Sequence, residues 1–86
     1  MAAQKQLSLK VVQRDKTIFE GPIVSLSSYN DKGKFDILEM HANFISLVKD
    51  EILIRLENGE EKSIPIKDGV LKVENDRIAI YLGVKF

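Results

Sequence analysis

Apolar and polar residues alternate along much of this chain. Apolar side chains recur at every second position in four segments: Leu7, Leu9 and Val11; Val24 and Leu26; Ile52, Ile54 and Leu56; Ile78, Ile80 and Leu82. A period of two places successive side chains on opposite faces of an extended strand, so each segment is expected to bury one face. Val and Ile together number 17 and Ala only 4, which also favours strands because β-branched side chains pack well on a pleated surface.

Residues typical of turns separate these segments. Asn58-Gly59, between two alternating runs, predicts a type I′ hairpin turn. Gly21-Pro22 is expected to restart a strand, and Pro65, which has no N–H to donate, predicts an edge or a bulge. The remaining predicted turns are Arg14-Asp15-Lys16, Asn30-Asp31-Lys32-Gly33, Lys67-Asp68-Gly69 and Asn75-Asp76. Turns at this spacing predict an all-β sandwich or barrel of short strands.

The segment from Phe35 to Val48 is ambiguous. Its apolar residues fit a helical stripe as well as two short strands, and the β-rich surroundings favour strand, loop, strand. Phe35, Leu38, Met40 and Phe44 cannot all enter the core of an extended segment. Either some of them form an exposed patch for a protein partner, or the segment crosses between sheets and packs inside.

Composition narrows the class of protein. With 86 residues the chain is one domain. It has 13 basic and 13 acidic residues, and this balance argues against a dedicated nucleic-acid binder and against a polybasic membrane-surface module. No apolar run approaches the roughly 18 residues of a membrane span. Met1–Gln6 lacks the apolar centre of a signal peptide, and the absence of cysteine excludes disulfides and thiolate chemistry.

Little in the sequence points to catalysis. His41 is the only histidine, and none of the serines lies in a glycine-flanked nucleophile motif. No His or Cys pair has the spacing of metal ligands, and no glycine-rich loop could cradle a phosphate. The sequence therefore predicts no catalytic residue, no metal site and no cofactor, and His41 is interpreted as a structural or interface residue.

Three stretches resemble the epsilon subunit of F-type ATP synthases. Leu9–Val12 followed by Thr17–Gly21 resembles the Val-Val strand and Phe-x-Gly step that open this family. Gly33–Asn43 stands where the family has Gly-Glu-hydrophobic-Gly-Ile-Leu/Tyr-Pro-Gly-His-Ala-Pro, and Asp68–Val73 resembles its Gly-Gly-hydrophobic-Leu-Glu-Val. The resemblance runs from Leu7 to Leu82, and order and spacing carry it together.

The resemblance implies a fold and a function. The fold is the epsilon N-terminal domain, a flattened β-sandwich of about ten short strands in two five-stranded sheets, here in a single domain over residues 1–86. The function is that of a central-stalk rotor subunit, without catalytic residues, that couples the gamma subunit to the membrane c-ring during ion-driven ATP synthesis. Such a protein lies at the cytoplasmic face of the bacterial inner membrane, peripheral through its complex, and binds no nucleic acid.

The family's contacts map onto named positions of this chain. On the gamma side they imply Gln13, His41 and Ser46. On the c-ring side they imply residues of the Gly33–Met40 segment: Lys34, Phe35, Leu38, Glu39 and Met40.

This chain departs from the family pattern at several points. Glu39-Met40 replaces Pro-Gly, Asp36 replaces a glycine, Asn43 replaces a proline, and Lys34 stands where an acidic residue is usual. The chain stops at Phe86, without the family's C-terminal pair of helices, which inhibit hydrolysis and in some members bind ATP. We therefore expect no nucleotide binding, which calorimetry with ATP measures directly.

Two alternatives stay open at this stage. The first is a stand-alone β-sandwich adaptor that binds proteins unrelated to ATP synthase. The second is a small β-barrel that binds oligonucleotides, against which the zero net charge and the 7% aromatic content argue.

Overall fold

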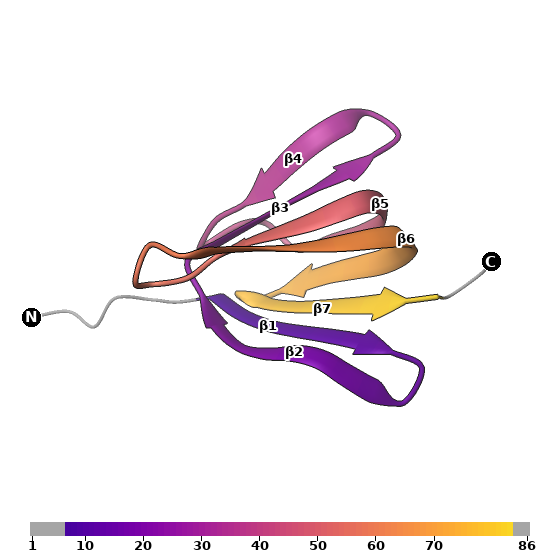
Figure 1. Ribbon diagram of the computed structural model, residues 1–86. Helices are drawn as coiled ribbons and strands as arrows, with labels where there is room; N and C mark the ends of the chain where they lie inside the picture. Colours follow the sequence, from indigo (N-terminus) through magenta and orange to yellow (C-terminus); the bar gives the residue numbers. More distant parts are fainter. Residues whose placement is uncertain (1–6, 84–86) are drawn as a thin grey trace, which may run out of the picture.

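The computed structural model describes residues 7–83, which consist of strands and turns alone (Figure 1). The predicted absence of a signal peptide concerns Met1–Gln6, which lie outside these residues. Over 7–83 no helix is long and apolar enough to span a membrane. The strands are β1 (Leu7–Gln13), β2 (Lys16–Ile23), β3 (Ser25–Asn30), β4 (Gly33–Ile37), β5 (Phe44–Arg55), β6 (Glu61–Glu74) and β7 (Arg77–Leu82).

All seven strands are hydrogen-bonded in one sheet, in the order β2-β1-β7-β6-β5-β3-β4. The pair β1–β7 is parallel and the other pairs are antiparallel. β5 and β6 have 12 and 14 residues, and both bend near their middles, so that the sheet folds back over itself (Figure 1). We call β2, β1, β7, 69–74 of β6 and 44–49 of β5 the five-stranded layer. We call β4, β3, 50–55 of β5 and 61–66 of β6 the four-stranded layer.

A β-bulge marks the bend. Lys49 pairs with Asp68 and the next residue, Asp50, pairs with Ile66, so Lys67 is an extra residue on β6. Asp50 has a φ of 72°, in the left-handed region. An extra residue bends a strand and increases its twist. It also shifts the inward-facing positions of β6 from Ile64 and Ile66 to Leu71 and Val73.

The core fills the space between the two layers. Its fourteen buried apolar residues come from every strand: Leu7, Leu9, Val11, Ile23, Leu26, Ile37, Val48, Ile52, Ile54, Leu71, Val73, Ile78, Ile80 and Leu82. Among residues 7–83, Ser28 is the one polar residue that is fully buried. Its Oγ donates a hydrogen bond to the Glu51 carbonyl at 2.7 Å. Paired burial of this kind avoids the cost of an unsatisfied hydroxyl in an apolar core.

The predicted all-β sandwich is confirmed, but its strand count differs. The expected ten strands in two sheets are seven strands in one continuous sheet. The difference arises because β5 and β6 each contribute to both layers without breaking. Of the four alternating segments, those in β1, β5 and β7 bury the predicted faces. The prediction that Val24 shares a buried face with Leu26 is wrong. Val24 lies at the bend between β2 and β3 and is exposed, while Ile23 and Leu26 on either side of it are buried.

Two of the predicted turns form, and one of them differs from the predicted geometry. Asn58-Gly59 lies in the β5–β6 hairpin, where the Gly59 N–H bonds the Leu56 carbonyl at 3.0 Å and the Leu56 N–H bonds Glu60. The bond between Leu56 and Glu60 encloses a loop of three residues, 57–59. Only Gly59 among them has positive φ, so the turn is not type I′. Type I′ geometry occurs instead at Asn75-Asp76, where both residues have positive φ and Glu74 pairs with Arg77.

Of the other local predictions, two are wrong and two are confirmed. Lys67-Asp68-Gly69 is not a turn, because it is the bulged part of β6. Gly21-Pro22 does not restart a strand: it lies inside β2, an edge strand in which a missing N–H breaks no ladder. Pro65 is at an edge, as predicted, because this half of β6 pairs with β5 alone. The segment 35–48 is strand, loop, strand, as predicted.

The close approach at Gly69 generates a stability prediction. A Cβ at this position would lie 2.9 Å from the Tyr81 carbonyl oxygen and 2.9 Å from Leu82 Cδ2. The carbonyl belongs to a paired strand and has little freedom to move. Gly69→Ala is therefore expected to lower the free energy of unfolding by about 1–3 kcal/mol, measured by urea denaturation followed by circular dichroism. Gly21→Ala is the control, because its Cβ meets nothing closer than 4.0 Å. Equal stability of the two variants would contradict the crowding at Gly69.

Candidate functional site

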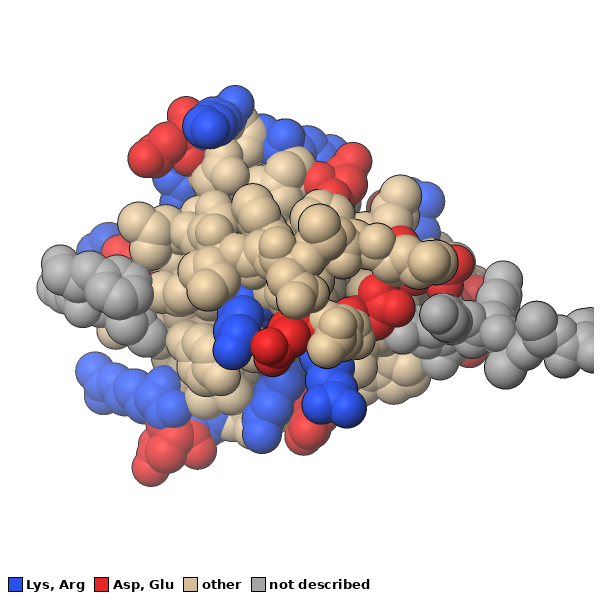
Figure 2. Space-filling view, turned by 180° about the vertical axis from the view of Figure 1, so that it is seen from behind, with Lys and Arg blue, Asp and Glu red and all other residues tan. Residues whose placement is uncertain are grey.

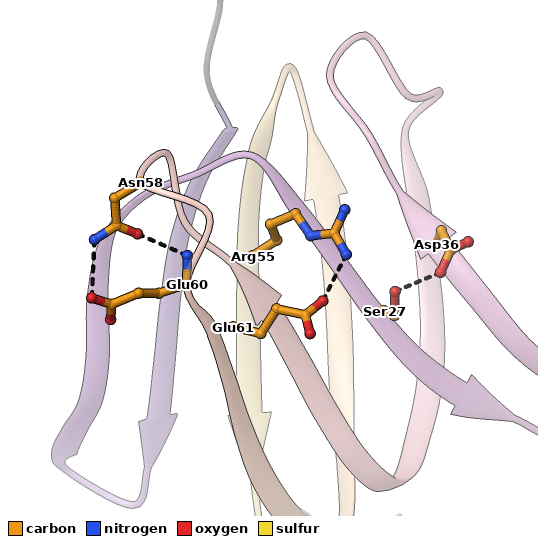
Figure 3. A network of polar contacts seen from close by, with 6 residues as sticks. All are labelled: Ser27, Asp36, Arg55, Asn58, Glu60 and Glu61. Carbon is orange, nitrogen blue, oxygen red and sulfur yellow. Dashed lines mark hydrogen bonds and ion pairs between the residues drawn. The ribbon is translucent and has the colours of Figure 1, made fainter.

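The outer face of the four-stranded layer is polar and its groups are paired. Ser27 Oγ donates to Asp36 Oδ1 at 2.5 Å, and Arg55 Nη2 bonds Glu61 Oε2 at 2.7 Å (Figure 3). Ser63 donates to Glu51 on the same face. In the adjoining hairpin the Glu60 N–H donates to Asn58 Oδ1 at 2.9 Å. Cross-strand pairs of this kind suit a surface in contact with water.

The outer face of the five-stranded layer is different, because an apolar row crosses it. Leu47 pairs with Val70, Val70 with Tyr81, and Tyr81 with Val12. The neighbouring row places Ile45 and Ala79 on either side of Lys72. We call these six residues the apolar face: Val12, Ile45, Leu47, Val70, Ala79 and Tyr81.

Exposure within the apolar face is high for large hydrophobic side chains. Ile45 is 69% exposed, Leu47 59% and Tyr81 46%. Seen from behind, the molecule presents a broad area of uncharged side chains bordered by charged ones (Figure 2). Contiguous exposed apolar surface on a small protein marks a site of interaction, whereas scattered hydrophobic residues do not. The apolar face is therefore the first candidate surface.

A second candidate is the loop between β4 and β5, residues 38–43, which we call the end loop. The His41 N–H bonds the Leu38 carbonyl at 3.2 Å, so 38–41 form a turn. Met40, its third residue, has a φ of 63° and is 73% exposed. A left-handed conformation costs a non-glycine residue roughly 1–2 kcal/mol. The turn presents two apolar side chains, Leu38 and Met40, at one end of the sandwich.

The structure does not gather the three residues predicted to face gamma. His41 stacks edge-on against Phe44, with ring centroids 5.7 Å apart, and Ser46 lies two residues further along β5. Ser46 Oγ accepts from Asn30 Nδ2 at 3.3 Å and donates to the Leu47 carbonyl. Gln13 pairs with Leu82, at the far end of β7 from the turn that the end loop contacts. At about 3.3 Å per residue, roughly 20 Å separate Gln13 from His41.

The residues predicted to face the c-ring divide between two sides. Lys34 points outward from β4 and lines a hollow with Asp36 and Leu38. Phe35 is on the opposite side of the same strand, half-buried, with its ring 5.6 Å from that of Phe44. It is a packing residue. Leu38, Glu39 and Met40 are consecutive in the end loop, and all three are exposed.

This placement settles the two alternatives for segment 35–48. Phe35 and Phe44 pack inward against the core, as a segment crossing between layers requires. Leu38 and Met40 face solvent, as an exposed patch requires. Both descriptions hold, for different residues of the same segment.

Sequence reasoning missed the apolar face. Each of its strands carries apolar residues at consecutive positions, such as Ile80-Tyr81-Leu82 and Val70-Leu71, so both sides of the strand are apolar. That signal was present in the sequence. The alignment of these outward residues into one row depends on strand pairing, which no local pattern reveals. Among residues 7–83 the structure contains no group of three or more potential metal ligands.

Solved structures share this fold. A chain of the Euglena gracilis mitochondrial ATP synthase, seen with OSCP, F1 and the c-ring, superposes with a TM-score of 0.86 at 16% identity. The match covers 95% of this chain and 53% of that one. A chain of the Tetrahymena thermophila mitochondrial ATP synthase central stalk and c-ring gives 0.74 at 11% identity, covering 94% and 66%. At these identities the comparison shows the fold alone.

Sequence relatives show more than the fold. The ATP synthase epsilon chain of Clostridium novyi is 34% identical over 77 residues, covering 88% of this chain and 59% of that one. The epsilon chain of a Nitratiruptor species is 34% identical over 79 residues, covering 90% and 61%. This chain thus spans about three fifths of their length. Residues 6–82 match the family described as ATP synthase, Delta/Epsilon chain, beta-sandwich domain, and the chain therefore belongs to that family.

Proposed function

We propose that this chain acts as the β-sandwich part of an ATP synthase epsilon subunit, a non-catalytic rotor element of the central stalk. The observation that carries the proposal is the family match over residues 6–82. The relatives named epsilon chain support it, and so does the presence of the same fold in the two mitochondrial ATP synthase structures. A subunit with this role acts through surfaces that contact its partners, and it needs no catalytic site.

The apolar face is the proposed docking site for the gamma subunit. A contact that stays closed while torque passes through it resembles an obligate interface, which is large and more apolar than a transient one. Leu47, Val70, Tyr81 and Val12 form a row across four paired strands, so they are held at fixed spacing. Tyr81 adds a large rigid side chain of the type enriched at interface centres. His41 and Ser46 lie on the other side of β5, beside Phe44 and Asn30, so the contact with gamma that the family resemblance implies for them would be separate from the apolar face.

The first half of the end loop, residues 38–40, is the proposed contact with the c-ring. Leu38, Glu39 and Met40 are exposed at one end of the sandwich, and Lys34 is on the adjoining outer face near Leu38. A protruding turn with both polar and apolar side chains suits a contact smaller than the proposed contact with gamma. Through both contacts the chain is peripheral to the membrane, at the cytoplasmic face of a bacterial inner membrane.

A charge in the apolar row tests the gamma contact. Leu47→Glu is expected to weaken binding of purified gamma subunit at least about tenfold, because an interface buries the new carboxylate without a partner. Val24→Glu is the matched control: Val24 is an exposed apolar residue outside the apolar face. Titration calorimetry measures both affinities, and circular dichroism checks that both variants melt like wild type. Equal affinity of the two variants would exclude the apolar face as the gamma site.

A second pair of substitutions separates the two contacts. The tagged chain is incubated with detergent-solubilised membranes of its own organism, and the retained subunits are identified by mass spectrometry. Lys34→Glu is expected to reduce recovery of c subunits severalfold while gamma remains, and His41→Ala is expected to reduce gamma. His41→Phe keeps the edge contact with Phe44 and controls for lost packing. Retention of neither subunit by wild type, from membranes that contain intact synthase, would favour the adaptor alternative.

A further inference from the structure

Two hydrogen bonds join the end loop to the turn between β6 and β7. The Met40 N–H donates to Asp76 Oδ1 at 2.6 Å, and the Asn75 N–H donates to Asn43 Oδ1 at 3.1 Å. The partners are 36 and 32 residues apart in sequence. The two bonds run in opposite directions, one donated by the loop and one accepted by it. Together they fix both ends of the segment 40–43.

The turn that holds the loop is itself well supported. Glu74 pairs with Arg77 across it, and the Ser8 N–H donates to the Asp76 carbonyl at 2.9 Å. β1, β6 and β7 therefore meet at Asp76, and all three are strands of the five-stranded layer. Its carboxylate is a fixed acceptor, whereas the end loop has no strand partner of its own over 38–43.

The loop needs such an acceptor because its own conformation is unfavourable. Met40 is the third residue of the 38–41 turn, a position where positive φ favours glycine. Strained residues persist where surrounding contacts over-determine them. The contact to the Met40 N–H is charge-assisted, which makes it stronger than a bond between neutral groups. Inside the loop, His41 Nδ1 lies 2.7 Å from the Ala42 carbonyl, and its ring packs on Phe44.

We propose that Asp76, assisted by Asn43, is a positioning residue that locks the end loop in the turn presenting Leu38 and Met40. The part of this inference that concerns binding rests on the proposed contact with the c-ring. The part that concerns the loop's conformation does not. Asp76 itself touches no partner in this scheme and acts through the Met40 backbone.

Amide hydrogen exchange by NMR tests the lock directly. Asp76→Ala removes the acceptor and is expected to raise the exchange rate of the Met40 amide about tenfold or more. Asp76→Asn keeps an oxygen at the same place and is expected to restore most of the protection. Asn75→Ala is the matched control, because Asn75 also has positive φ in the same turn but its side chain does not hold Met40. Asn43→Ala is expected to deprotect the Asn75 amide.

A binding measurement separates an effect on the position of the end loop from a general loss of stability. Recovery of c subunits from solubilised membranes is expected to fall severalfold with Asp76→Ala and to stay near wild type with Asn75→Ala, even where both melt at the same reduced temperature. Unchanged Met40 exchange in Asp76→Ala would overturn the lock. Faster exchange with unchanged recovery would overturn its role in presentation. Failure of the wild-type chain to retain any synthase subunit would reject the proposed function, while the exchange data would still decide the lock.

Discussion

The fold of this chain depends on one irregularity in its longest hairpin. β5 and β6 together could form a flat ribbon, which would leave both faces of a continuous sheet in water. The extra residue Lys67, opposite the left-handed Asp50, bends the ribbon instead. On one side of the bend Ile64 and Ile66 face the core, and on the other Leu71 and Val73 do. A single sheet thereby encloses its own interior, since the bulge reverses which positions of β6 point inward.

Folding one sheet over itself also makes its two outer faces independent of each other. The four-stranded face carries paired polar groups such as Ser27–Asp36 and Arg55–Glu61. The five-stranded face carries Leu47, Val70, Tyr81 and Val12 in one row. An isolated β-sandwich needs only its inner faces to be apolar. The second apolar layer adds nothing to the core, and its exposure is the reason we propose it as a docking surface.

The sequence predicted what depends on local periodicity. Leu9, Ile54 and Ile80 could be assigned to the core because alternation alone determines which face they occupy. It did not predict that Lys67-Asp68-Gly69 continues a strand, because a bulge and a turn use the same residue types. Nor did it distinguish the turn at Asn58-Gly59 from that at Asn75-Asp76. Both pairs tolerate positive φ, and the number of residues between the last paired positions decides the type.

The candidate site was predictable only where it is local in sequence, as in the exposed Leu38 and Met40. The apolar row draws one residue from each of four strands, so it exists only after pairing. The same holds for Asp76, whose side chain reaches a loop 36 residues earlier.

The end loop adopts a conformation for which its own residues have little intrinsic preference. Met40 stands where the resembling sequences have glycine, and its φ of 63° lies in the region that glycine favours. Asn43 stands where they have proline, and its side chain accepts a hydrogen bond from Asn75. Glycine and proline shape a loop through the backbone alone, whereas methionine and asparagine cannot. In the arrangement we propose, contacts from the neighbouring turn hold the loop, so its shape depends on the packed sandwich.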